Sequence, residues 1–95
     1  MEYIEPGNDI KGIIILVFLD DDNYSTKRTE DTLNMTIGLL PCRRIRKTDS
    51  RKELYKIKKY PTFLVVDDGA ILHRIEGWVE IGTIGELRRL SYTYQ

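Results

Sequence analysis

The sequence predicts one small α/β domain with a mixed, four-stranded sheet and flanking helices. Residues 13–19 are a continuous, β-branched apolar run, which is typical of a strand buried on both faces. Asp67-Asp68-Gly69 separates two further apolar runs and predicts a hairpin. Helical patterns follow the first two strands, so the order βαβ followed by ββα is expected. A chain of 95 residues suits a single domain, with a core at 12–91 and tails at 1–11 and 92–95.

The first half of the chain predicts a strand, a helix and a second strand. The polar residues after 13–19 end the first strand, and a helix is expected from about 25 to 35, with Leu33 as one of its few apolar positions. The second strand is expected at 40–45. Pro41 cannot donate to a sheet ladder, so this strand either lies at an edge or starts late.

Two capping boxes predict the remaining helices. Ser50 and Glu53 have the spacing at which each side chain caps the other's backbone amide, so a helix is expected over 51–58. Thr83 and Glu86 repeat the pattern before the last helix. Between these helices the hairpin strands are expected at 62–66 and 70–75. Three residues of the return strand are predicted on one face: Ile71, His73 and Ile75.

Composition excludes several kinds of chemistry. Cys42 is the one cysteine and His73 the one histidine, so a disulfide framework, a CxxC redox pair and a cysteine-rich zinc site are excluded within one chain. We expect no cofactor and no metal. The acidic N-terminus does not resemble a signal peptide, and a seven-residue apolar run is far below the ~20 residues of a membrane helix. A cytoplasmic location and no membrane partner are expected.

The neutral total charge hides an uneven distribution. Residues 41–60 carry a net charge of +7, whereas residues 1–40 carry −5 and residues 61–95 carry −2. A positive face of this kind could bind nucleic acid or an acidic protein, or could simply be a solvated strand edge. The candidate basic surface consists of five residues: Arg43, Arg44, Arg46, Lys58 and Lys59.

The segment from Tyr60 to Gly77, YPTFLVVDDGAILHRIEG, resembles the thioredoxin family. The shared features are a Pro-Thr pair, an apolar strand, a polar-Gly turn, a second strand and a glycine. The likeness continues upstream through Leu54-Tyr55-Lys56-Ile57 and, by pattern, covers roughly residues 13 to 90. It implies a minimal thioredoxin-like fold and a cis Tyr60–Pro61 bond facing the active-site loop. Twelve residues before the first apolar run are too few for the family's leading strand and helix together.

The resemblance also implies that redox activity is lost. The four CxxC positions of the family fall on Asn23-Tyr24-Ser25-Thr26, and hydroxyls cannot replace thiols in disulfide exchange. We therefore expect a redox-inactive protein-binding or adaptor module, and not an enzyme. One alternative is a divergent thiol oxidoreductase using Cys42, and another is a nucleic-acid-associated protein using segment 43–59. The candidate binding residues are Asp22, Asn23, Tyr24, Ser25, Thr26, Tyr60, Pro61 and Trp78.

Three consecutive aspartates, Asp20 to Asp22, follow the first strand. Carboxylates at a strand end suit a hard cation such as Mg²⁺. Acids at this place also stabilise the dipole of the helix that follows, and this is the interpretation that we favour.

Overall fold

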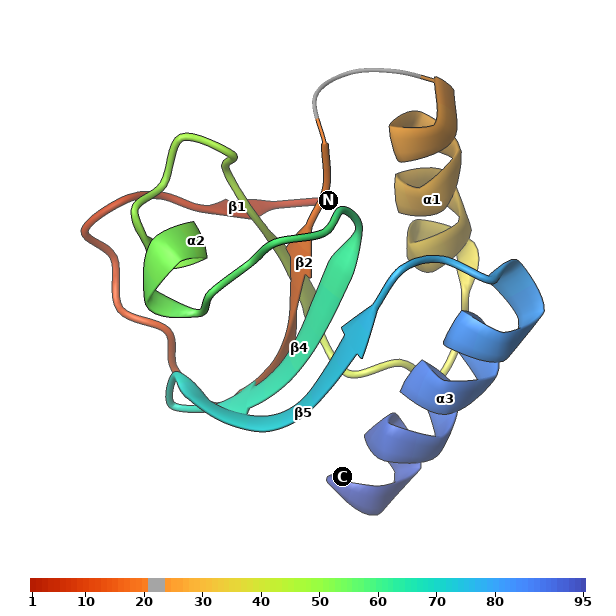
Figure 1. Ribbon diagram of the computed structural model, residues 1–95. Coiled ribbons are helices and arrows are strands. Elements are labelled where there is room, and N and C mark those ends of the chain that lie inside the picture. Colours follow the sequence, from red (N-terminus) through yellow and green to blue (C-terminus); the bar gives the residue numbers. More distant parts are fainter. Residues whose placement is uncertain (21–23) are drawn as a thin grey trace.

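The computed structural model describes residues 1–20 and 24–95 and shows an α/β domain with one mixed sheet (Figure 1). The strands are β1 (Tyr3–Ile4), β2 (Ile13–Phe18), β3 (Cys42–Ile45), β4 (Thr62–Asp67) and β5 (Ala70–Glu76). Their order across the sheet is β1-β3-β2-β4-β5. The first three strands are parallel, and β4 is antiparallel to both β2 and β5.

Among the described residues the sheet has five strands, so the prediction of four was wrong. β1 has only two residues, and Tyr3 pairs with Arg44 of β3. A strand of two residues is too short to show a hydrophobic pattern, and its pairing partner lies some forty residues away in the sequence. β1 also makes β3 an interior strand and excludes the edge position. β3 instead starts late, at Cys42, and the Pro41 carbonyl accepts a 2.8 Å hydrogen bond from the Ile15 amide.

In the described part of the chain, three helices cover the two faces of the sheet. α1 (Tyr24–Met35) and α3 (Glu80–Thr93) lie on one face, and the short α2 (Arg51–Leu54) lies on the other (Figure 1). Each face has its own apolar core because the side chains of β2 and β4 alternate between them. Leu33 of α1 and Leu87 of α3 pack with Val17 in one core, and Tyr55 packs with Leu64 in the other.

α2 is shorter than predicted and is capped differently. Ser50 makes no side-chain capping bond, and the Asp49 carboxylate accepts a 2.9 Å hydrogen bond from the Arg51 amide instead. The helix ends at Leu54 because Lys56 has a left-handed φ of 54°. The expected helix over 51–58 therefore stops after one turn.

α3 begins earlier than the second capping box predicted. Its first residue is Glu80, and Thr83 lies inside the first turn, where its hydroxyl accepts a 3.0 Å hydrogen bond from the Val79 amide. The helix continues to Thr93, into the segment that the sequence left as a tail. The buried residues Leu87 and Leu90 anchor this second half on the sheet.

A β-bulge changes the predicted faces of β5. Val65 pairs with His73 whereas the next residue, Val66, pairs with Ile71, so the register shifts between them. Val65 and Val66 point to opposite faces, and Ile71 therefore does not share the face of His73. The prediction that Ile71, His73 and Ile75 share one face was wrong for Ile71, because a bulge leaves no pattern in the sequence of the bulged strand.

Candidate functional site

A groove of about 400 Å³ lies at one end of the sheet. Phe18 at the end of β2 pairs with Thr62 at the start of β4, and Thr62 pairs with Glu76 at the end of β5. The loops at these strand ends therefore meet beside the start of α1. The lining residues are Leu19, Asp20, Ser25, Thr26, Thr29, Tyr60, Pro61 and Trp78.

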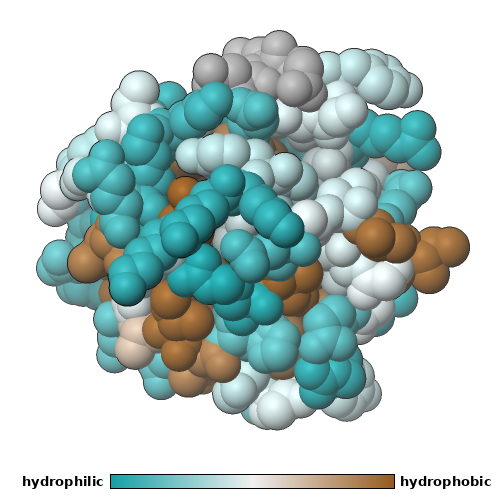
Figure 2. All heavy atoms as spheres, viewed as in Figure 1, coloured by the Kyte–Doolittle hydropathy of each residue, from teal (hydrophilic) through white to brown (hydrophobic). Residues whose placement is uncertain are grey.

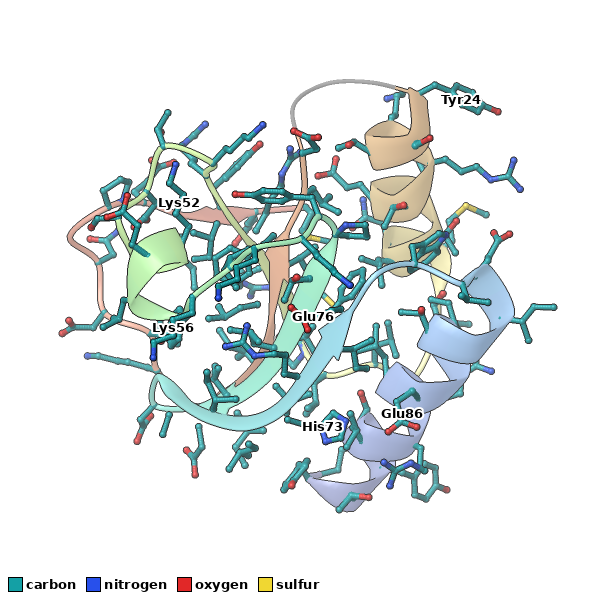
Figure 3. All side chains as sticks on the ribbon, viewed as in Figure 1. Tyr24, Lys52, Lys56, His73, Glu76 and Glu86 are labelled. Carbon is teal, nitrogen blue, oxygen red and sulfur yellow. The ribbon has the colours of Figure 1, made fainter. Side chains whose placement is uncertain are left out.

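The groove brings together five of the predicted binding residues, namely Ser25, Thr26, Tyr60, Pro61 and Trp78. Tyr24 does not join them. Its side chain is 79% exposed and points away from the sheet (Figure 3), where it borders a separate shallow depression on the outer side of α1. Asp22 and Asn23 lie outside the described residues.

Sequence reasoning missed Thr29 and Leu19 as lining residues. Thr29 follows Ser25 by four positions and Thr26 by three, so helical spacing places all three on one face of α1. That spacing was a signal available in the sequence. Leu19 directly follows β2 and was read as part of the buried strand, and it is indeed 2% exposed.

The loop before β4 is fixed by hydrogen bonds at the Lys59 and Pro61 carbonyls, on either side of Tyr60. The Tyr60–Pro61 peptide bond is cis. The Thr62 hydroxyl donates a 2.7 Å hydrogen bond to the Lys59 carbonyl, and the Gly77 amide donates a 2.8 Å bond to the Pro61 carbonyl. Within the described residues, no hydrogen bond uses the backbone N–H or C=O of Tyr60. These two groups are thus available to a chain lying in the groove.

Trp78 connects the groove to the core. Its ring contacts Phe63, with the ring centroids 5.7 Å apart and the planes at 42°. Phe63 is completely buried, whereas Trp78 is half-buried and lines the groove. Trp78 is therefore a rim residue of the core that also borders the groove.

Asp20 is fixed by its neighbours on the groove floor. Its carbonyl accepts hydrogen bonds from the Arg44 guanidinium at 3.2 Å and from the Thr26 hydroxyl at 3.3 Å. Its carboxylate forms an ion pair with Lys47, whose ammonium also lies 5.4 Å from the centre of the Tyr60 ring. These contacts neutralise the one acidic side chain among the described lining residues.

The described part of the chain contains no group of three His, Cys, Asp or Glu side chains placed to hold a metal ion. The cation hypothesis for the three aspartates concerns Asp21 and Asp22 as well, and both lie outside the described residues.

The predicted basic surface is not one continuous surface. Arg44 is buried, with 8% of its surface exposed. Each of the three arginines pairs with a glutamate from the first thirty residues: Arg43 with Glu2 (3.7 Å), Arg44 with Glu30 (3.1 Å) and Arg46 with Glu5 (2.7 Å). Lys58 and Lys59 are exposed and have no ion-pair partner among the described residues.

Cys42 lies far from the groove and is poorly suited to react. It pairs with Ile15 of β2, four residues before Leu19, which is about 13 Å along the strand. Burial raises the pKa of its thiol to about 11, although the neighbouring Arg43 acts in the opposite direction. The half-buried side chain packs against the core on the α1 side, so the thiolate is strongly disfavoured at neutral pH.

A comparison with protein-family models gave no match, and a comparison with curated proteins gave no significant match. In the part of the chain that the structure describes, no helix combines the length and the hydropathy needed to cross a membrane.

Proposed function

We propose that the chain is a redox-inactive thioredoxin-like domain that binds an extended segment of a partner protein in the groove. The resemblance of residues 54–77 supports this proposal. The structure has the short helix α2, which ends at Leu54, and then the Pro61-Thr62 pair, an antiparallel hairpin and Gly77, in the order that the resemblance implies. We place the protein in the cytoplasm, where a free thiol such as Cys42 persists.

The open backbone of Tyr60 is the observation that carries the proposal. An extended chain that lies beside Tyr60 gains two backbone hydrogen bonds, one donated by the Tyr60 N–H and one accepted by the Tyr60 C=O, as in other cases of strand addition. Trp78 and Pro61 add apolar and aromatic surface for side chains of that segment. The groove thus offers backbone pairing together with side-chain contacts.

The chemistry of the lining favours binding over thiol exchange. Exchange requires a thiolate that attacks a disulfide and a second thiol that resolves the product. The described lining offers the hydroxyls of Ser25 and Thr26 at this place. Cys42 lies beside Ile15 within β2, away from the groove, and its pKa is raised. Both observations count against the alternative of a thiol oxidoreductase.

The proposal is tested with a phage-displayed library of random extended peptides selected on the folded protein. We expect selected peptides to perturb the amide NMR signals of Tyr60 and Thr62 and the indole signal of Trp78. Trp78→Ala should weaken binding, whereas Tyr92→Ala, at an exposed site of α3, should not. The proposal fails if no peptide is selected, or if the perturbed signals lie away from the groove.

An insulin-reduction assay tests the redox alternative separately. The reduced protein should not accelerate disulfide reduction. Acceleration that Cys42→Ser abolishes would replace the binding function with an oxidoreductase.

The nucleic-acid alternative depends on exposed lysines. Lys58 and Lys59 are the members of the predicted basic surface that have no carboxylate partner in the described part of the chain. We expect weak retention on heparin, since the three arginines are paired internally. Strong retention that disappears when both lysines are changed to glutamate would favour this alternative.

A further inference from the structure

Thr29 differs from the other threonines in the helices of this protein. The hydroxyls of Thr32 and Thr93 donate to the carbonyl four residues earlier, at 2.8 and 3.0 Å, and the Thr26 hydroxyl donates to the Asp20 carbonyl. Thr83 accepts from the Val79 amide. Thr29 is 96% buried, with 4% of its surface exposed, yet its hydroxyl has no hydrogen-bond partner within the described residues. A buried hydroxyl without a partner is unusual in a folded protein.

The free hydroxyl borders the groove. In the described part of the chain, Arg44 Nε is the one side-chain polar atom that is both fully enclosed and without a partner, so the Thr29 hydroxyl is not fully enclosed. The Thr29 hydroxyl is therefore reached by solvent, and Thr29 is a lining residue of the groove. Ser25 lies one helical turn earlier on the same face of α1. This wall of the groove therefore presents an unused donor and acceptor at a nearly buried position.

The lining also favours an uncharged occupant. Asp20 is paired with Lys47, and the other described lining residues carry no charge. A charged side chain pressed against Thr29 would lose its hydration and gain only a hydroxyl contact, which is strongly unfavourable. A hydroxyl or carboxamide side chain can both donate to and accept from Thr29 without that loss.

We propose that Thr29 determines the specificity of the groove, and that the bound segment places an uncharged hydrogen-bonding side chain, Ser, Thr, Asn or Gln, against its hydroxyl. This inference rests on the proposed peptide-binding function and adds the chemistry of the segment. The open backbone of Tyr60 holds any extended chain, whereas Thr29 distinguishes between side chains.

The test uses a peptide selected from the library and three variants of α1. Thr29→Val removes the hydroxyl at almost unchanged volume and should weaken binding on the order of tenfold. Thr29→Ser keeps the hydroxyl and should bind close to the wild type. Thr32→Val is the matched control, because Thr32 lies on the outer side of the same helix. We expect the thermal midpoint of free Thr29→Val to stay close to that of the wild type, since the change breaks no hydrogen bond within the described residues.

A second arm changes the peptide. Replacing its hydroxyl or amide residue with an apolar residue of similar shape should cost the wild type about the same factor and cost Thr29→Val little, as a double-mutant cycle requires. Binding should also change little between low and high salt.

Each failure has a distinct meaning. If peptides bind at Tyr60 but Thr29→Val binds them equally well, the role of Thr29 is overturned and the proposed function stands. If the selected peptides carry an acidic or phosphorylated residue at the Thr29 position and bind more weakly in high salt, the uncharged class is wrong. If no peptide is selected, the proposed function fails, and this inference fails with it.

Discussion

The thiol of Cys42 should react far more slowly than an ordinary cysteine. Burial raises its pKa from the ordinary 9.0 to about 11. At pH 8 about one thiol in a thousand is then ionised, compared with about one in ten for an unperturbed group. Only the thiolate attacks an alkylating agent or a disulfide. Alkylation of the folded protein should therefore be about 100-fold slower than that of a free thiol.

The assay is the rate of carboxamidomethylation by iodoacetamide, followed by mass spectrometry over a range of pH. The rate should rise about tenfold per pH unit and level off only near pH 11. The same protein unfolded in guanidinium chloride is the control and should level off near the ordinary pKa. A folded-state rate that levels off below pH 8 would refute the reasoning. It would also restore Cys42 as a candidate nucleophile.

Three further predictions concern stability, and urea unfolding measures each. Glu30→Gln leaves the buried Arg44 without its carboxylate and should cost about 2 kcal/mol, less than for a fully enclosed pair because the Glu30 side chain is 23% exposed; an unchanged midpoint would contradict this. Asp49→Asn should cost about 2 kcal/mol near pH 6. Hydrogen bonds from Arg51 lower the pKa of Asp49 below 3.8, so the wild type should lose this advantage as the pH falls below about 4; a gap independent of pH would contradict it. Leu87→Ala removes a fully buried side chain between α3 and the sheet and should cost about 3 kcal/mol; a cost below about 1 kcal/mol would show a loosely packed contact.

The sequence predicted the elements that leave a local pattern. The apolar run from Ile13 is the central strand β2, because a strand buried on both faces needs apolar residues at successive positions. The hairpin turn was equally readable, since Asp68 and Gly69 have left-handed φ values of 48° and 88° that this turn requires. β1 could not be predicted, because its two residues are extended only through pairing with β3.

The capping boxes show why a correct motif can still misplace a helix. Ser50 has the right spacing to Glu53. The Asp49 carboxylate, however, carries a charge and accepts the hydrogen bond from the Arg51 amide only two residues further on. The Thr83 hydroxyl does accept a hydrogen bond from a backbone amide, but that amide is the one of Val79, before the helix. α3 therefore starts four residues earlier than expected. The spacing of polar residues predicted that helices begin near these positions. The capping bonds actually formed differ from the predicted ones, and so do the helix bounds.

The groove was only partly predictable for a related reason. Ser25 and Tyr60 came from the resemblance, whereas Thr29 follows from helical spacing once α1 is known to line the groove. Tyr24 does not line the groove, because adjacent helical residues point in directions about 100° apart. A segment alignment treats four consecutive residues alike, but a helix presents only some of them to a given surface.

The segment charges of −5, +7 and −2 were summed along the sequence, which does not show which elements contact one another. β1 and α1 both pack beside β3, so the positive segment meets the glutamates of the negative one, and its arginines are used in ion pairs within the fold. The charge left over belongs to lysines in and after α2, including Lys52 and Lys56, where Figures 2 and 3 show hydrophilic side chains over that face. This face lies on the opposite side of the sheet from α1 (Figure 1). Under the proposed function, we expect a partner to be selected by backbone pairing and by uncharged groups such as the Thr29 hydroxyl, because the described residues that line the groove carry no unpaired charge.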